Sequence, residues 1–206
     1  MPTDRSTFFE EAFASQRIML ILRGHSPDET VRRAEQAWDL GIEIVEVPVE
    51  TPNALPSLYA ALDMARKRGK VLGAGTVFTT EQLDAVAEVR VDFTVAPGFD
   101  PAIAKRSLDL GLPHLPGVSS ATEIQRALSE GFRWVKAFPA SVLGEEWFRA
   151  MRGPFPSLRI VATGGVDADN AAGFIEAGAD VVSLGSSLPN PEQLRRTVEI
   201  LNAIRR

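Results

Sequence analysis

One lysine of this chain stands inside an apolar, strand-like segment. Lys136 lies within Trp134–Pro139, whereas the other three lysines, Lys67, Lys70 and Lys105, fall on expected helices or at a helix end. A buried ammonium must be paired or lose its proton, since burial lowers the pKa of a lysine. A neutral amine is a nucleophile that forms Schiff bases with carbonyl compounds. The pattern predicts a nucleophilic lysine, with a structural ion pair as the alternative.

A carboxylate forms the second candidate for chemistry. Glu46 lies near the end of the apolar segment Ile42–Pro48, and strand alternation places it on the same face as Ile44 and Pro48. A carboxylate at this position could move protons as a general acid–base, or it could pair with Lys136 without a catalytic role.

Positioning these two residues requires a regular scaffold, and the chain shows one. Short β-rich segments begin roughly 20 to 29 residues apart, a spacing that accommodates a strand, a loop and a helix. Helix starts are marked by capping boxes at 26–29 and 120–123 and by Asp100-Pro101 and Asn190-Pro191. The eight predicted strands are Ile18–Leu22, Ile42–Val47, Val71–Val77, Asp92–Ala96, His114–Val118, Trp134–Phe138, Arg159–Thr163 and Val181–Leu184.

Eight strand–helix units predict a parallel sheet, because such crossovers are right-handed and bring successive strands side by side. Closure gives a single (β/α)8 TIM barrel over residues 1–206, with an extra N-terminal helix around Phe8–Phe13. An open doubly wound sheet is the alternative. It usually carries a glycine-rich turn after its first strand, and Leu22-Arg23-Gly24-His25 is not such a turn.

In a TIM barrel the active site lies at the C-terminal ends of the strands, where several candidates fall. Glycines after the last two strands could cradle a phosphate through backbone N–H groups, with simple turn chemistry as the alternative, and their paired location in a barrel favours the phosphate. Thr76 could donate to a carboxylate, and Arg23 could clamp one or pair with Glu50. The candidate substrate-binding residues are Arg23, Thr76, Pro97, Phe138, Thr163, Gly164, Gly165, Gly185, Ser186 and Ser187.

Composition argues against several other classes. A formal net charge of −5 leaves no basic surplus for nucleic acid, and the apolar runs are too short to cross a bilayer. The chain has no cysteine, and its two histidines, His25 and His114, lack the spacing of metal ligands. No Gly-x-Ser-x-Gly motif supports a serine triad. A cytoplasmic protein without a metal is therefore expected.

With these residues in place, the chain resembles the 2-keto-3-deoxy-6-phosphogluconate aldolase family, including its 6-phosphogalactonate and 4-hydroxy-2-oxoglutarate relatives. The resemblance runs from about Ile18 to Leu188. Its blocks, specific when taken together in this order, are Val45–Val47, Gly73–Val77, Ala96–Gly98, Leu115–Ser119, Val135–Ala140 and Ala162–Val166.

The resemblance implies a class I aldolase that needs no metal or other cofactor and acts on a small keto-acid substrate. Lys136 would form the Schiff base, Glu46 would act as general acid–base, and Thr76 would help to hold the pyruvate carboxylate. The phosphate would be bound by Gly164, Gly165, Gly185, Ser186 and Ser187. A homotrimer is usual in this family.

One position departs from the family pattern. In the phosphogluconate enzymes, the segment after the catalytic glutamate resembles Leu-Arg-Thr-Glu, and its arginine binds the substrate carboxylate. This chain has Val49-Glu50-Thr51-Pro52 there. Pro52 and the Ile21–Gly24 segment instead resemble the phosphogalactonate branch, while Thr163 resembles the phosphogluconate branch, so the stereochemistry at C4 stays open. Three alternatives stay open too: a 4-hydroxy-2-oxoglutarate aldolase without a phosphate requirement, a phosphosugar isomerase or epimerase, and a non-catalytic barrel that binds phosphorylated acids.

Overall fold

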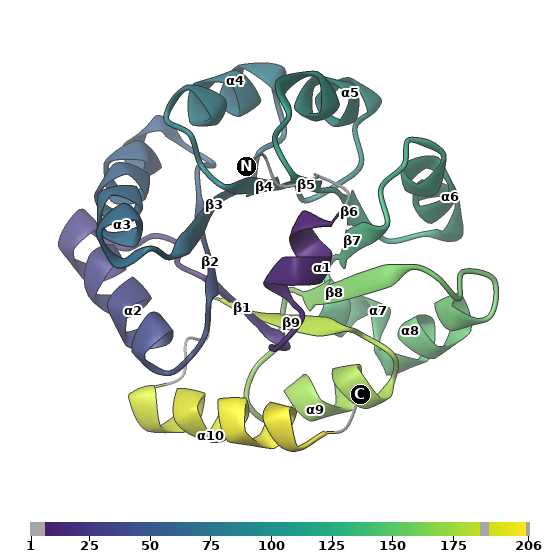
Figure 1. The fold of residues 1–206 in the computed structure, drawn as a ribbon. Coiled ribbons are helices and arrows are strands. Elements are labelled where there is room, and N and C mark those ends of the chain that lie inside the picture. The colour runs from purple at the N-terminus through teal and green to yellow at the C-terminus, as the bar shows by residue number, and fades with distance from the viewer. Residues whose placement is uncertain (1–6, 186–189, 205–206) are drawn as a thin grey trace.

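The computed structural model describes residues 7–185 and 190–204, and its centre is a parallel sheet that curves into a nearly closed barrel (Figure 1). The strand order around the barrel is β5-β4-β3-β2-β1-β9-β8-β7-β6. The strands are β1 Ile18–Ile21, β2 Ile44–Pro48, β3 Val71–Gly75, β4 Phe93–Val95, β5 His114–Leu115, β6 Gly117–Val118, β7 Trp134–Ala137, β8 Arg159–Thr163 and β9 Val181–Leu184. The predicted barrel is thereby confirmed.

One predicted strand, His114–Val118, is divided in two. Pro116 lies between β5 and β6 and has no N–H to donate to a neighbouring strand. Its carbonyl still accepts from Lys136 N at 2.8 Å, and the Leu115 carbonyl accepts from Ala96 N at 3.0 Å. The β5–β6 segment thus joins β4 on one side to β7 on the other and closes the barrel.

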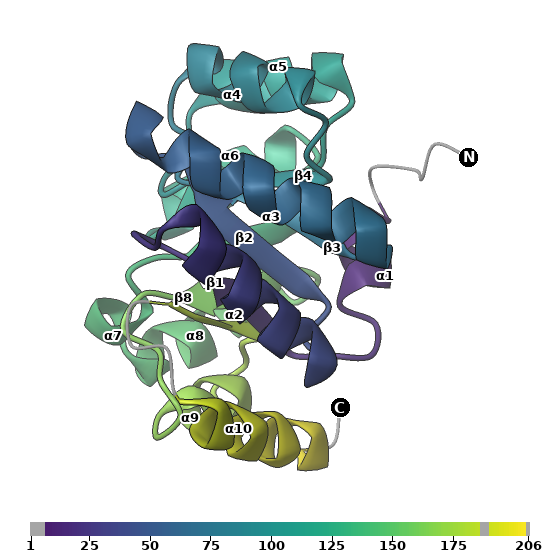
Figure 2. The same cartoon turned by 90° about the vertical axis from the view of Figure 1, so that its left-hand side faces the viewer.

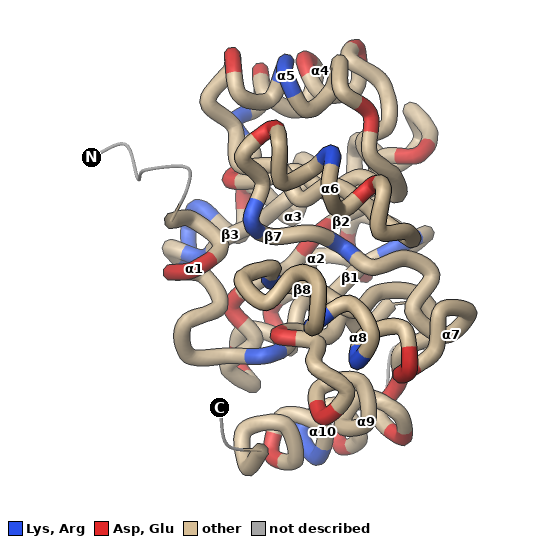
Figure 3. Tube along the Cα trace, turned by 90° about the vertical axis from the view of Figure 1, so that its right-hand side faces the viewer, with Lys and Arg blue, Asp and Glu red and all other residues tan. Residues whose placement is uncertain are grey.

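Helices α2 to α10 surround the barrel on its outside (Figures 1 and 2). They are α2 Pro27–Asp39, α3 Leu55–Arg68, α4 Thr80–Glu88, α5 Pro101–Leu110, α6 Ala121–Ser129, α7 Ala140–Leu143, α8 Glu145–Arg152, α9 Ala171–Glu176 and α10 Pro191–Ala203, with a 3-10 turn at Pro52–Ala54; the remaining helix is α1 Phe8–Ala12. None of the described helices is both long and apolar enough to cross a membrane. Lys and Arg lie interspersed with Asp and Glu along the chain (Figure 3).

The predicted capping residues begin their helices, but both predicted capping boxes form only by half. Ser26 and Ser120 each accept from the backbone N–H three residues on. The Glu29 carboxylate binds Arg32 and Arg33 instead of the cap, and the Glu123 carboxylate accepts from Ser119 N. The glutamate of each box therefore binds other groups: two arginine side chains for Glu29, and Ser119 N with the Ser119 and Ser120 hydroxyls for Glu123.

The short helix α1 closes the N-terminal end of the barrel, where Figure 1 shows it at the centre of the ring. Phe9 and Phe13 pack there against inward-facing strand residues, with ring centroids of Phe9 and Phe93 5.8 Å apart and those of Phe13 and Trp134 5.1 Å apart. The remaining inward residues of this apolar layer are Met19, Ile44, Val95, Leu115, Val161 and Val181. The layer forms a floor beneath the next inward-facing positions.

Candidate active site

A cavity of about 350 Å³ lies at the C-terminal ends of the strands. Nine of the predicted site residues line it: Arg23, Thr76, Pro97, Lys136, Phe138, Thr163, Gly164, Gly165 and Gly185. Ile21, Val166 and Ser183 complete the described lining. The predicted residues Ser186 and Ser187 lie outside the part of the chain that the structure describes.

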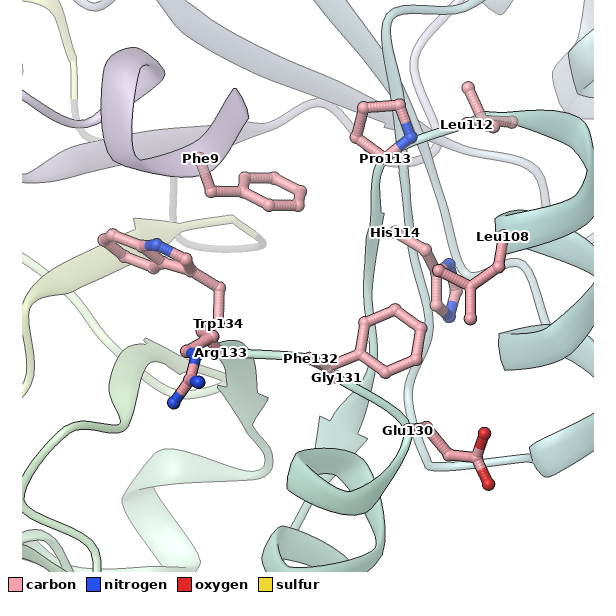
Figure 4. A pocket seen from close by; sticks show the side chains of 10 residues that line it. All are labelled: Phe9, Leu108, Leu112, Pro113, His114, Glu130, Gly131, Phe132, Arg133 and Trp134. Atoms are coloured by element: carbon pink, nitrogen blue, oxygen red, sulfur yellow. The ribbon is translucent and has the colours of Figure 1, made fainter. Parts of the chain in front are cut away.

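A second cavity, of about 280 Å³, lies at the opposite end of the barrel (Figure 4). Its walls include Phe9, Leu108, Phe132 and Trp134, and it contains none of the predicted site residues. The predicted site residues that line a cavity in the described part of the chain therefore gather at the C-terminal end, in accord with the position of active sites in this fold.

Lys136 enters the first cavity from β7 and is 3% exposed. Its register partner on β6 is Gly117, where a Cβ atom would collide with the backbone of Pro97 and Gly98, so this glycine lets the loop after β4 approach the barrel wall. Burial lowers the pKa of Lys136 below its ordinary value; the Glu46 carboxylate opposes this shift and the positive charge of Arg23 adds to it. The Nζ atom lies 5.1 Å from the centre of the Phe138 ring. Compared with an exposed lysine, Lys136 is therefore shifted toward the neutral, nucleophilic amine.

Glu46 faces the barrel interior from β2 and is fully buried. Neither carboxylate oxygen has a hydrogen-bond partner within the protein, and no Glu46–Lys136 ion pair occurs among the described salt bridges, which extend to 4.0 Å. Burial raises the pKa of Glu46, while the charges of Lys136 and Arg23 lower it to a smaller degree. A direct salt bridge, one interpretation of the sequence, is therefore not formed.

One glycine of β3, Gly75, makes room for this carboxylate, because a Cβ atom added there would lie 2.6 Å from Glu46 Oε1. Real Cβ atoms do not approach an oxygen so closely, so an alanine at Gly75 would displace the carboxylate. Gly73, the register partner of Glu46, makes room for the Phe93 ring instead. Gly75 thus shapes the space around Glu46.

Arg23 pairs with Glu50 and also lines the cavity. The ion pair with Glu50 is therefore compatible with a role for Arg23 in binding a carboxylate. Arg23 Nη1 lies 3.0 Å from Glu50 Oε1, and Nη2 donates to Thr76 Oγ1 at 2.9 Å. Thr76 has a φ of 58°, in the left-handed region that a β-branched residue rarely adopts. Such strained residues occur most often at functional sites.

The loop after β8 presents free backbone N–H groups. In the described part of the chain, the N–H groups of Gly164, Gly165 and Val166 donate to no protein atom, whereas the carbonyls of both glycines accept from Ser141 N and Asn170 Nδ2. Gly164 and Gly165 have φ values of 93° and 72°, and a Cβ at Gly165 would collide with the Ser141 hydroxyl. Successive free N–H groups of this kind form an anion site.

Ser183 belongs to the cavity, although the sequence analysis did not select it. Its hydroxyl accepts from Thr163 Oγ1 at 3.1 Å, and the two side chains are 1% and 2% exposed. The available signal was a hydroxyl at an inward position of the apolar segment Val181–Leu184, two residues before Gly185. Among the described residues, no cluster of three or more His, Cys, Asp or Glu side chains is placed to hold a metal ion.

The fold and the cavity define a class: a TIM-type barrel whose cavity is lined by a buried lysine and an anion-receptive loop, with a buried carboxylate, Glu46, in the barrel interior outside the described lining. Within that class, a model of the family described as KDPG and KHG aldolase matches residues 9–201. The chain therefore belongs to the KDPG and KHG aldolase family.

Individual relatives agree with this assignment. The chain is 37% identical over 199 residues to a 2-dehydro-3-deoxy-phosphogluconate aldolase of Treponema pallidum, with 91% of this chain and 88% of that protein covered. It is 34% identical over 172 residues to a 2-dehydro-3-deoxy-6-phosphogalactonate aldolase of Escherichia coli, with 83% of each covered. A solved structure described as native KDPGal matches with a TM-score of 0.77 and 34% identity over 90% of both chains.

Proposed function

We propose that this protein is a class I aldolase that cleaves a 2-keto-3-deoxy-6-phospho sugar acid to pyruvate and glyceraldehyde 3-phosphate. Family membership supports the reaction class. The observation that carries the residue-level proposal is Lys136, an amine that is 3% exposed, lines the cavity and has a lowered pKa.

In the proposed reaction, Lys136 Nζ attacks the C2 carbonyl of the substrate, and loss of water from the adduct gives an iminium. Glu46 then accepts the proton of the C4 hydroxyl, and the C3–C4 bond breaks. The electron pair of that bond moves through C3 to the iminium nitrogen, and the aldehyde leaves. Return of the proton to C3 of the enamine and hydrolysis release pyruvate and the free lysine.

The cavity offers two anion sites, one for each end of such a substrate. Arg23 and Thr76 lie at the ends of β1 and β3 and would hold the carboxylate. The free N–H groups of the Gly164–Val166 loop would hold the phosphate, together with Gly185, Ser186 and Ser187. Pro97, Phe138 and Thr163 would complete the walls around the reacting carbon atoms.

Borohydride trapping tests the proposal. Full-length protein is incubated with pyruvate and sodium borohydride and is then analysed by intact mass and peptide mapping. We expect a stable adduct on Lys136, no adduct in Lys136→Ala, and a loss of cleavage activity of about a thousandfold or more in that variant. Lys105→Ala is the matched control, because Lys105 is an exposed lysine on α5 and should leave trapping unchanged.

The outcome separates the remaining candidates. Absence of an adduct at saturating pyruvate would contradict the aldolase and favour a phosphosugar isomerase or epimerase, or a barrel that binds phosphorylated acids without chemistry. With an adduct established, relative turnover of the 6-phosphogluconate-type and 6-phosphogalactonate-type acids and of 4-hydroxy-2-oxoglutarate decides the stereochemistry at C4 and the need for phosphate.

Further parts of the proposal concern the whole protein. We expect residues 1–206 to form a single domain that works without a metal or other cofactor, as a homotrimer in the cytoplasm. The supporting argument is the likeness to the aldolase family. Light scattering measures the oligomeric state, and activity after extensive dialysis against a chelator measures the metal requirement.

A further inference from the structure

Three consecutive strand ends bring Arg23, Glu50 and Thr76 together. Backbone hydrogen bonds extend the sheet past its last strand residues: Leu22 N donates to the Glu46 carbonyl at 2.9 Å, and Val49 N donates to the Gly75 carbonyl at 2.8 Å. These bonds place the residues that follow, Arg23, Glu50 and Thr76, side by side. Their positions are fixed by the barrel rather than by a loose loop.

Glu50 lies beside the cavity without facing it. Arg23 and Thr76 are among the lining residues, whereas Glu50 is absent from the described lining. One of its carboxylate oxygens binds Arg23 Nη1 at 3.0 Å, and the other is buried without a hydrogen-bond partner in the protein. A negative charge that pointed into the cavity would repel an anionic substrate, and this arrangement directs it at Arg23 instead.

We infer that Glu50 is a positioning residue, which holds the guanidinium of Arg23 across the mouth of the cavity as a preformed clamp for the substrate carboxylate. The inference rests on the proposed function, because it assigns Arg23 and Thr76 to that carboxylate. A positioning role explains why an acidic residue lies beside an anion site. Direct contact between Glu50 and the substrate would not explain it, because the two negative charges would repel each other.

Held in this way, Arg23 organises a second donor. Arg23 Nη2 donates to Thr76 Oγ1, so the hydroxyl proton of Thr76 is left to donate to an anion. The Arg23 side chain is 41% exposed and without Glu50 would sample many rotamers, so substrate binding would cost conformational entropy. The ion pair with Glu50 restricts these rotamers before the substrate binds and lowers that entropic cost.

Two measurements on variants of the full-length enzyme test the inference. One is the pyruvate concentration that gives half-maximal borohydride trapping, and the other is the separate determination of KM and kcat for cleavage. We expect Glu50→Ala to raise both the half-saturation and KM about tenfold while kcat changes less than about threefold. Glu50→Gln keeps the shape and one acceptor and should raise them less. In an Arg23→Ala background, Glu50→Ala should add nothing further.

Asp84→Ala is the matched control, because it breaks an ion pair with Arg106 at 2.8 Å between α4 and α5. It should leave both constants unchanged. An unchanged or lowered half-saturation in Glu50→Ala would overturn the inference, since Glu50 would then be inert or a repulsive charge. Wild-type protein that forms no Lys136 adduct would refute the proposed function instead, so the two failures are distinguishable.

Discussion

Lys136 and Glu46 are two buried titratable residues whose pKa values are shifted toward their neutral forms. Burial lowers the pKa of the lysine and raises that of the glutamate, and the described salt bridges include no direct contact that would lock the two as an ion pair. A lysine tied to a carboxylate would have to break that bond before attacking a carbonyl. Their separation leaves the amine available for attack and the carboxyl group available for proton transfer.

Replacing Glu46 by glutamine should move the pH dependence of Schiff-base formation. The Glu46 charge raises the pKa of Lys136, so its removal lowers that pKa further and keeps the amine neutral to a lower pH. We expect the acidic limb of the trapping-rate profile to shift to lower pH, while cleavage falls about a hundredfold or more because the general acid–base is lost. Stopped-flow trapping across pH 5 to about 9 measures the limb.

Glu43→Gln serves as the control for this experiment. Glu43 precedes β2, at the other end of the barrel, and its carboxylate binds Lys70 at 2.9 Å. The variant removes one negative charge from the same part of the chain, and the limb should stay in place. A limb that moved to higher pH in Glu46→Gln would contradict the electrostatic account.

At the residue scale, the sequence predicted those site residues whose type conflicts with their surroundings. A lysine in an apolar strand and a glutamate near the end of another are visible without a structure. Ser183 was missed because one serine in an apolar segment is common and conflicts with nothing. The role inferred for Glu50 depends on which way its carboxylate points, and the sequence does not contain that direction.

At the scale of elements, the strands were predictable because each is a short apolar segment and the segments recur at a spacing that accommodates a strand, a loop and a helix. The division of His114–Val118 was harder to foresee, since Pro116 interrupts the hydrogen bonding of a segment that is otherwise strand-like. The N-terminal helix was predicted from its amphipathic pattern. Its place inside the end of the barrel depends on packing among distant aromatic residues, which a local pattern does not record.

Phe9 tests what α1 contributes to stability. Its ring is 5% exposed and contacts four other rings, those of Phe8, Phe13, Phe93 and Trp134. We expect Phe9→Ala to lower the free energy of unfolding by about 3 kcal/mol, because a large buried side chain is replaced by a cavity. Urea denaturation followed by circular dichroism measures this change.

The matched control for that substitution is Phe78→Ala. Phe78 is 50% exposed, so the same truncation should change the free energy of unfolding by less than about 1 kcal/mol. Borohydride trapping at Lys136 should persist in folded Phe9→Ala, since α1 lies at the end opposite the cavity. A loss for Phe9→Ala no larger than that for Phe78→Ala would show that α1 does not hold the barrel end.

At the scale of the whole molecule, the two ends of the barrel are built differently. The N-terminal end is packed with aromatic side chains around α1, and the C-terminal end holds the cavity that is lined by Lys136, Arg23 and the free N–H groups of the loop after β8. This division lets the apolar layer stabilise the fold while Lys136 and Glu46, which are costly to bury, occupy the layer above. Stability and chemistry are thus assigned to different layers of one barrel.

Stability of the whole molecule should also depend on pH through His114. Burial lowers the pKa of this histidine from 6.5 to about 4, and its Nδ1 atom lies 2.8 Å from Thr94 Oγ1. The unfolded chain binds a proton near pH 6.5, whereas the folded protein does so only near pH 4. This contribution to stability is therefore complete above about pH 6.5 and is lost as the pH falls toward 4, by up to about 3 kcal/mol.

His114→Asn isolates this contribution, because asparagine does not titrate and can still bond to the Thr94 hydroxyl. Urea unfolding of both proteins at several pH values between about 7 and 4.5 gives the difference in free energy of unfolding, in which the contributions of all other titrating groups cancel. We expect the wild type to be the more stable at neutral pH and to lose this advantage as the pH falls. Parallel pH profiles would contradict this prediction. They would mean that His114 takes up its proton equally in the folded and unfolded states, so that its burial does not shift its pKa.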